Sequence, residues 1–197
     1  MVRAPWLALW MCLAAACCAA PDSVYSNIKY KFSLSPPAGW VARDHPEAIA
    51  VFIEQGAEPG PPPSRTESNR EFIARVSRKL SAPPTTAAGF RANLTIAAAK
   101  VLAGTTVEKY ARESRRRFEG LKTYRMLGEK PVKADGKPAV LRAMKVDLAE
   151  GDSIRMRELI VIRGEDALTF TMAAVPETFA RHSAEFDRTM STLKWTQ

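Results

Sequence analysis

The chain has 197 residues, of which 46% are hydrophobic and 25% are charged, and its formal net charge is +8. This length and this mixture are typical of one globular domain, and they exclude an intrinsically disordered chain and a bundle of membrane helices. The excess of basic residues favours an anionic partner, such as lipid headgroups or an acidic protein surface.

The N-terminus predicts a secretory signal segment over residues 1–20. Arg3 precedes an apolar run from Leu7 to Ala20 that ends in small residues, which is the pattern of a signal peptide. The run of about 14 residues is shorter than the roughly 20 that a helix needs to span a bilayer. We therefore expect an exported, periplasmic protein whose mature part, residues 21–197, is a single domain.

Two processing sites compete within this segment. Cys18-Ala19-Ala20 suits cleavage after Ala20, whereas the stretch from Leu13 to Cys17 resembles a bacterial lipoprotein signal that is cleaved before Cys17. Leu13 stands one position further from Cys17 than is usual in such signals, so the match is imperfect. Attachment of a lipid to Cys17, with Cys18 as a second candidate, is the alternative that we favour.

The mature domain offers few residues for catalysis or metal binding. All three cysteines lie at positions 12, 17 and 18, so neither a disulfide framework nor a reactive thiol is expected. His45 and His182 are the only histidines, and we expect both at the surface; without a Cys cluster or a His pair, no metal site is predicted. Motifs for nucleophilic, phosphate-binding or metalloprotease chemistry are absent from the sequence. We therefore expect a protein that is not an enzyme and needs no cofactor.

The first half of the mature chain predicts strands and an insertion. Ile28–Leu34 alternates apolar and polar residues, which predicts a strand with one buried face. Ser35–Gly39 contains two prolines and predicts a turn, after which Trp40 packs on the core. Ala48–Ile53 predicts a second, more fully buried strand, and Phe90–Ala98 predicts a third.

Between the second and third of these strands lies a Pro-rich, basic insertion over residues 56–84. Its apolar side chains recur at helical spacing and predict a short amphipathic helix: Phe72, Ile73, Val76 and Leu80. This helix is a candidate binding patch, because Arg70, Arg75, Arg78 and Lys79 have few compensating acids. Each basic group near an anionic membrane surface contributes about 1 kcal/mol.

The next element is a charged helix ending near Glu119. Thr105–Glu108 matches a capping box, in which a Thr oxygen and a Glu three residues later satisfy free backbone N–H groups. Apolar and small residues then share one face of the helix: Val107, Tyr110, Ala111, Ser114 and Phe118. Three pairs of opposite charge stand four residues apart and favour an exposed helix face, namely Glu108–Arg112, Glu113–Arg117 and Arg115–Glu119. Arg116 alone has no such partner, so it joins the candidate binding patch.

The remainder predicts an antiparallel meander followed by a helix. Short turns, including Asp135-Gly136, join four strands: Tyr124–Lys130, Pro138–Leu148, Ile154–Ile162 and Leu168–Val175. Pro176 then opens a helix whose inward face carries Phe179, Ser183, Phe186 and Met190, and Leu193 and Trp195 pack on the sheet. Because the strand at 154–162 is apolar on both faces, the sheet needs a layer on each side, which predicts an α+β fold.

This order of motifs resembles the PsbP/DcrB-like family over nearly the whole mature chain. The resembling segments are Tyr30-Lys-Phe-Ser-Leu-Ser-Pro-Pro-Ala-Gly-Trp40, Thr106-Val-Glu-Lys-Tyr110, Asp135-Gly-Lys-Pro-Ala139, Leu168–Met172, Pro176–Phe186 and Met190–Lys194. The insertion at 56–84 departs from the family pattern, so no partner is carried over from it. The resemblance implies a three-layer αβα sandwich around a central antiparallel sheet, and it supplies no catalytic residue.

The resemblance also implies a binding module, because the family includes photosystem II extrinsic subunits, a nuclear import factor, envelope lipoproteins and secretion chaperones. We expect an exported, lipid-anchored envelope protein that is not an enzyme and that binds an envelope protein, a membrane-associated partner or anionic lipid headgroups. A periplasmic domain that binds or hydrolyses a small ligand is the alternative, and a structural extrinsic subunit is a third. Nucleic acid is not expected as a partner, because export separates the chain from it and no aromatic platform accompanies the basic residues.

Overall fold

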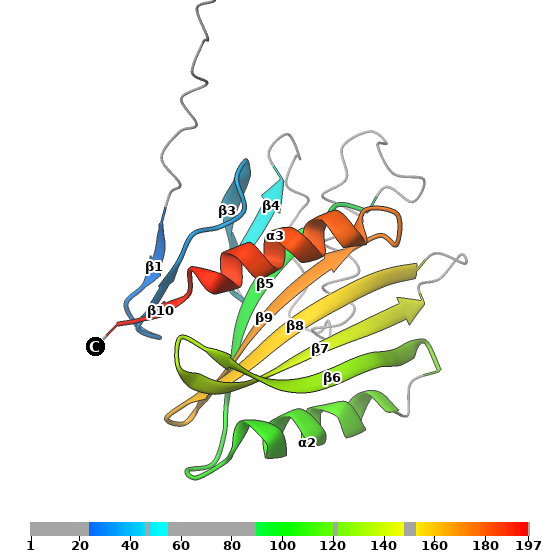
Figure 1. The fold of residues 1–197 in the computed structure, drawn as a ribbon. Helices are drawn as coiled ribbons and strands as arrows, with labels where there is room; N and C mark the ends of the chain where they lie inside the picture. The colour runs from blue at the N-terminus through cyan, green and yellow to red at the C-terminus, as the bar shows by residue number, and fades with distance from the viewer. Residues whose placement is uncertain (1–23, 46–47, 55–89, 120–121, 148–152, 197) are drawn as a thin grey trace, which may run out of the picture.

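A seven-stranded antiparallel sheet forms the centre of the molecule (Figure 1). The computed structural model describes residues 24–45, 48–54, 90–119, 122–147 and 153–196. The order of strands across the sheet is β3-β4-β5-β9-β8-β7-β6. These strands are β3 (Trp40–His45), β4 (Ala48–Glu54), β5 (Asn93–Lys100), β6 (Tyr124–Ala134), β7 (Lys137–Asp147), β8 (Ser153–Arg163) and β9 (Asp166–Ala174).

A helix lies on each face of this sheet, so the fold has three layers (Figure 1). Helix α2 (Val107–Glu119) packs on one face, against β6, β7 and β8. Helix α3 (Phe179–Ser191) packs on the other face, against β9. A small sheet of β1 (Tyr25–Asn27), β2 (Phe32–Leu34) and β10 (Lys194–Trp195) joins the α3 layer. The predicted α+β class is confirmed.

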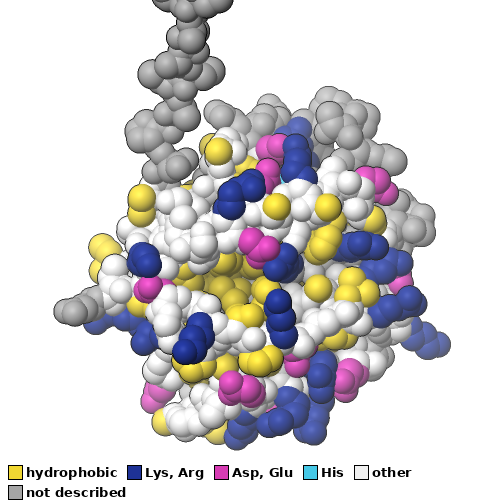
Figure 2. Space-filling model, viewed as in Figure 1, with side chains coloured by type: hydrophobic (Ala, Val, Ile, Leu, Met, Phe, Trp, Pro, Cys, Tyr) yellow, Lys and Arg dark blue, Asp and Glu magenta, His cyan; other side chains and the backbone are white. Residues whose placement is uncertain are grey.

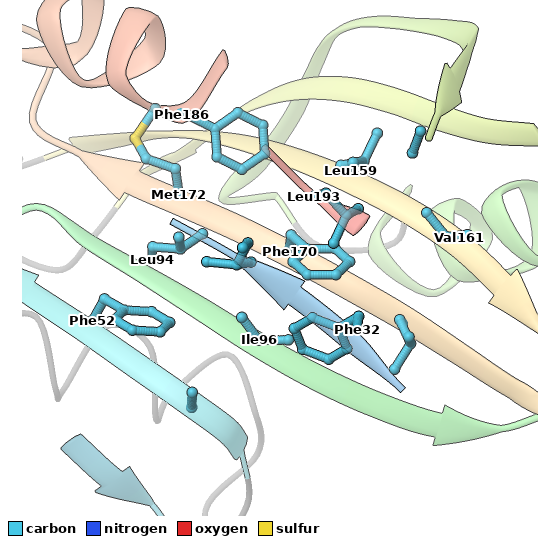
Figure 3. Close-up of a cluster of buried hydrophobic side chains, with 14 of the residues drawn as sticks. Phe32, Phe52, Leu94, Ile96, Leu159, Val161, Phe170, Met172, Phe186 and Leu193 are labelled. Carbon is cyan, nitrogen blue, oxygen red and sulfur yellow. The ribbon is translucent and has the colours of Figure 1, made fainter. Parts of the chain in front are cut away.

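The main core fills the space between the sheet and the α3 layer (Figure 3). Phe186 of α3 and Leu193 reach down onto Phe170 and Met172 of β9, and all four side chains are at most 2% exposed. Phe32 of β2 packs edge-on against Phe170, with 5.5 Å between the ring centroids. Burying an aromatic or Leu side chain stabilises a fold by about 1.5–3 kcal/mol, so this cluster holds both terminal segments on the sheet.

The four strands of the meander match the predicted ones, and their turns explain the pairing. Asp135 and Gly136 both have positive φ angles, of 46° and 80°, as a tight hairpin turn between β6 and β7 requires. Strand β8 is buried on both faces, with Leu159 and Val161 toward α3 and Ile154 and Ile160 on the opposite face. The two-sided burial predicted from its sequence is confirmed.

The strand predicted over Ile28–Leu34 is wrong in its first half. Residues 28–31 form a turn between β1 and β2, and Ile28 is 92% exposed. The side chain of Asn27 accepts a hydrogen bond from the backbone N–H of Tyr30 at 2.9 Å, and Lys31 has a φ angle of 51°. This local side-chain bond closes the turn. Alternation of apolar and polar residues does not distinguish such a turn from a strand.

The start of α2 lies one residue later than the predicted capping box. The hydroxyl of Thr106, not that of Thr105, accepts a hydrogen bond from the backbone N–H of Lys109, at 3.2 Å. The first helical bond runs from the N–H of Tyr110 to the carbonyl of Thr106. Thr106 is therefore the N-cap. Glu108 lies in the first turn of the helix, only two residues after the cap, so it is not the third-position Glu of a capping box.

Several predictions lie outside the described residues: the signal segment 1–20 with Cys17, the insertion at 56–84, and the amphipathic helix with Arg70, Arg75, Arg78 and Lys79. In the part of the chain that is described, neither helix has the length and apolar character needed to cross a bilayer.

Candidate functional site

One half of the central sheet has no described helix over it on the side that carries α3, although Ala139, Leu159 and Val161 on that side are buried in the main core. Helix α3 lies against β9, and the described elements leave the neighbouring surface of β6, β7 and β8 without a helix (Figure 1). We call this surface, formed by the α3-side residues of β6, β7 and β8, the open face. The other side of the same three strands is covered by α2.

Three basic residues form a row across the open face. The strand register places Arg125 of β6 directly opposite Lys145 of β7, and Lys145 directly opposite Arg155 of β8. We call these three residues the cationic row. Directly opposed residues have Cβ atoms about 5 Å apart, and like charges in such pairs destabilise a sheet. Figure 2 shows Lys and Arg side chains gathered at the right of the view, where β6 begins and β7 ends in Figure 1.

The cationic row is only partly neutralised by described neighbours. Lys145 pairs with Asp147 of the same strand at 2.8 Å, and Arg155 lies over the ring of Phe179, 5.9 Å from its centroid. A hydrogen bond from Lys145, together with the charges of Lys145 and Arg125, holds the pKa of Asp147 below its ordinary value. Among the described residues, no carboxylate lies within ion-pair distance of Arg125 or Arg155.

Arg157 joins the open face to α3. It stands next to the row, opposite Ala143 on β7, and its guanidinium pairs with Asp187 at 2.8 Å and donates a hydrogen bond to Ser183. The same guanidinium lies 6.0 Å from the ring centroid of Phe186. These contacts from α3 fix the position of Arg157 at the border between the row and the helix.

Beyond Arg157 the open face turns apolar. Leu141 of β7 pairs with Leu159 of β8, and the next pair along the strands is Ala139 with Val161. Val132 of β6 and Met190 of α3 pack against the same cluster, and Val132, Leu141 and Met190 are partly exposed. We call the three partly exposed residues, Val132, Leu141 and Met190, the apolar floor. Figure 2 shows hydrophobic side chains in a hollow at the centre of this view, with basic side chains around it.

The α2 side of the same strands carries paired charges instead. Arg142 of β7 is 3% exposed and donates from Nε to Glu158 of β8, which also accepts a bond from Thr171 at 3.3 Å. Arg142 Nη1 donates to Ser114 of α2 at 2.8 Å. Burial raises the pKa of neighbouring Tyr124 to about 12. Both members of this ion pair have further hydrogen-bond partners, and the bond to Ser114 links α2 to the sheet.

Of the predicted patch, the structure describes Arg116 alone. Arg116 is exposed on α2, on the opposite side of the sheet from the cationic row. The predicted pair Arg115–Glu119 is confirmed at 3.1 Å, and Arg115 also pairs with Glu129 of β6 at 3.3 Å. The predicted pair Glu108–Arg112 does not form in the described helix. The structure therefore does not bring Arg116 together with the open face.

The surface placement predicted for His182 is wrong. His182 is 2% exposed on the buried side of α3, where its ring packs edge-on against Trp40 at 5.8 Å between centroids. Nδ1 lies 2.9 Å from a carboxylate oxygen of Glu185, and Nε2 lies 3.1 Å from Arg181. Both ring nitrogens are thus engaged within the fold. The described residues include no group of three or more His, Cys, Asp or Glu side chains placed to hold a metal ion.

Sequence reasoning missed the cationic row because a β-bulge brings Arg125 into it. The hairpin turn pairs Ala134 with Lys137, and this register continues to Gly128 opposite Ala143. Without interruption it would place Met126 opposite Lys145. The irregularity between Met126 and Gly128 shifts the pairing by one residue, so Arg125 faces Lys145 on the open face. The one sequence signal was the lone glycine at 128 within a strand pattern.

Comparisons with solved structures identify the fold. The chain is similar to the solution structure of cyanobacterial PsbP (CyanoP) from Synechocystis sp. PCC 6803, with 13% identity, 88% of this chain and 91% of that one covered, and a TM-score of 0.55. It is similar to LpqN of Mycobacterium tuberculosis, described as involved in cell envelope biogenesis, with 10% identity, 90% and 86% covered, and a TM-score of 0.56.

A third similar structure is PA94 of Pseudomonas aeruginosa, described as a protein of unknown function and putative regulator. It has 16% identity and a TM-score of 0.51, with 80% of this chain and 98% of that one covered. No protein-family model and no curated protein matches the sequence. At these identities the likenesses establish that the chain has a PsbP-like fold.

Proposed function

We propose that this protein is an exported bacterial envelope protein, anchored by a lipid on Cys17, that acts as a non-enzymatic binding module. Its ligand-binding surface is the open face, and its ligand is an anionic protein or lipid of the envelope. The cationic row carries this proposal, because Arg125, Lys145 and Arg155 are held side by side on a part of the sheet that no described helix covers. A protein that gained only stability from these positions would not oppose like charges.

The similar structures support the proposal at the level of the fold. LpqN is described as involved in cell envelope biogenesis, and its fold is shared here. The non-enzymatic role is supported by the burial of His182, which is 2% exposed and whose ring packs against Trp40. The apolar floor favours a ligand that is amphipathic as well as anionic.

Site-specific photocrosslinking in bacterial cells tests the binding surface. A photoreactive amino acid replaces Lys130, which lies opposite Leu141 at the edge of the open face, and in a matched control it replaces Arg116 on α2. We expect an adduct from position 130 and none from position 116. Equal labelling from both positions, or none from position 130, contradicts the proposal.

The anchor needs its own measurement. We expect the mature N-terminal peptide to begin at Cys17 with a diacylglyceryl modification by mass spectrometry. The Cys17→Ser variant is then expected to lose this mass and to leave the membrane fraction. An unmodified N-terminus at Pro21 contradicts the anchor and leaves the binding surface to be judged by the crosslinking result alone.

A further inference from the structure

The open face joins its cationic and apolar parts along the same three strands. From Lys145 in the cationic row to Leu141, which is partly exposed in the apolar floor, β7 advances by four residues. At about 3.3 Å per residue this is roughly 13 Å. A charged end and an apolar end, separated by this distance on one recessed surface, suit one amphipathic molecule.

We propose that the open face binds a single phosphate-bearing lipid, with its phosphate against Arg125, Lys145 and Arg155 and its acyl chain along the apolar floor. This inference rests on the proposed binding role of the open face and names its ligand. Arg and Lys recognise phosphate oxygens by charge-assisted hydrogen bonds, and Arg does so with two parallel bonds. Arg125 and Arg155 stand two strand spacings apart, about 10 Å, so one phosphate between them lies within reach of all three side chains.

The shape of the open face favours a lipid over a partner protein. Figure 2 shows a hollow lined by hydrophobic side chains, and a single acyl chain fits into a hollow more easily than a convex protein surface does. The free edge of β6 is also protected against strand addition by a partner. It carries the bulge at Leu127 together with Lys130, Pro131 and Lys133, which are features that block edge-to-edge pairing.

The α3 side of the face supplies the border between the two ends of the ligand. Arg157 is held by Asp187 and Ser183, so its guanidinium is already neutralised and positioned at the point where the row meets the floor. Met190 of α3 is itself part of the floor, so the helix borders the floor directly. The helix therefore forms one wall of the proposed lipid site, and β6 forms the other.

Native mass spectrometry of the full mature protein, released from detergent, tests this site with defined probes. The probes are dioleoyl phosphatidylglycerol, dioleoylglycerol, which lacks the phosphate, and glycerol phosphate, which lacks the acyl chains. We expect one phosphatidylglycerol per protein and at least tenfold weaker binding of each of the other two. Equal binding of dioleoylglycerol overturns the role of the phosphate, and equal binding of glycerol phosphate overturns the role of the floor.

Matched charge variants locate the site. The triple variant Arg125→Gln, Lys145→Gln, Arg155→Gln removes the cationic row, and the triple variant Lys109→Gln, Arg112→Gln, Arg116→Gln removes the same charge from α2. At about a fivefold effect per basic group, we expect the first variant to bind phosphatidylglycerol about a hundredfold more weakly. The second is expected to bind like the unaltered protein. An equal loss in both variants overturns the site, because it indicates attraction by net charge.

Failure of this inference and failure of the proposed function are distinguishable. A protein adduct at position 130 in cells, without lipid binding in the mass spectrometer, leaves the open face as a binding surface and overturns the lipid. If position 130 gives no adduct of any kind, both the lipid ligand and the open face as a binding surface are overturned.

Discussion

On one face of strands β6, β7 and β8 the charged side chains are paired, and on the other face like charges stand side by side. Under α2, the buried guanidinium of Arg142 is matched by Glu158, and Ser114 and Thr171 complete the network. On the open face, the same strands carry Arg125, Lys145 and Arg155 in direct opposition, with Asp147 as the only described carboxylate that pairs with the row. The closed face satisfies its charges internally, and the open face leaves them to solvent or to a ligand.

This difference separates polar residues that hold the fold from polar residues that are free to bind. A buried charge without a partner destabilises a protein by several kcal/mol, so a charged side chain on the closed face needs a partner of opposite charge. Exposed charges are screened by water and salt, so a row of cations is tolerated on the open face. The distinction predicts that substitutions on the two faces have effects of different size and of opposite sign.

Removing one partner of the buried pair is expected to have the largest effect. Glu158→Ala leaves Arg142 charged and buried beneath α2, and we expect it to lower the free energy of unfolding by about 3–5 kcal/mol. Urea unfolding followed by circular dichroism measures this loss.

The double variant Arg142→Met, Glu158→Leu is the control. It replaces both charges by apolar side chains of similar volume, and we expect it to recover most of the stability that Glu158→Ala loses. If Glu158→Ala lowers the free energy of unfolding by less than about 1 kcal/mol, the pair is solvated and the closed face does not differ from the open one.

The helix cap gives the next largest effect and also concerns the closed face. Thr106→Ala removes the acceptor of the Lys109 N–H at the start of α2, and we expect it to lower the free energy of unfolding by about 1 kcal/mol. Thr105→Ala is the matched control, because the cap bond is made by its neighbour, and a change of less than about 0.5 kcal/mol is expected. A larger loss for Thr105→Ala would restore the capping box as predicted from sequence. Urea unfolding again serves as the measurement.

The sequence predicts the layers of this fold better than its surfaces. The four meander strands, the Asp135-Gly136 turn and the two-sided burial of β8 follow from hydrophobic period and turn chemistry. These are local properties of consecutive residues. The αβα arrangement follows in turn, because a sheet that is apolar on both faces requires two covering layers.

The candidate site depends on register, which local patterns do not contain. The bulge between Met126 and Gly128 decides that Arg125 lies on the open face, and the glycine at 128 is the only sequence signal for it. The pair Arg142–Glu158 was missed for the same reason, since its residues lie on different strands. His182 was misplaced because its neighbour Arg181 is exposed, although a helix turns by 100° between adjacent residues.

A local pH effect is expected at the edge of the α3 layer. The carboxylate of Asp135 accepts hydrogen bonds from the backbone N–H of Trp195 at 3.0 Å and from Lys194 at 3.1 Å, and these bonds hold its pKa below the ordinary value. A lowered pKa means that the carboxylate stabilises the folded state above the unfolded pKa of about 3.9. This contribution is lost as the pH falls through the folded pKa, so acid is expected to loosen β10 while α2 stays in place.

The indole N–H of Trp195, which donates to the carbonyl of Ala134 at 3.0 Å, reports on this change by nuclear magnetic resonance. We expect its resonance to shift between pH 5 and pH 2. In Asp135→Asn the shift is expected to disappear, because Asn tolerates the positive φ angle of this position but does not titrate. An unchanged pH profile in the variant would mean that another group controls the docking of β10.

The smallest effect on stability is expected from the cationic row, and its sign distinguishes the two faces. Arg125→Gln removes a charge that directly opposes Lys145, so we expect the free energy of unfolding to rise by about 0.2–0.5 kcal/mol at low salt. Raising the salt concentration to about 1 M shortens the screening length to about 3 Å, and the gain should then vanish. Urea midpoints at two salt concentrations measure both effects, with Arg112→Gln on α2 as the control. If Arg125→Gln instead lowers the free energy of unfolding by several kcal/mol, the cationic row stabilises the fold and the two faces do not differ in this respect. A gain, combined with weaker lipid binding, would mean that this arginine destabilises the sheet and is retained for its ligand.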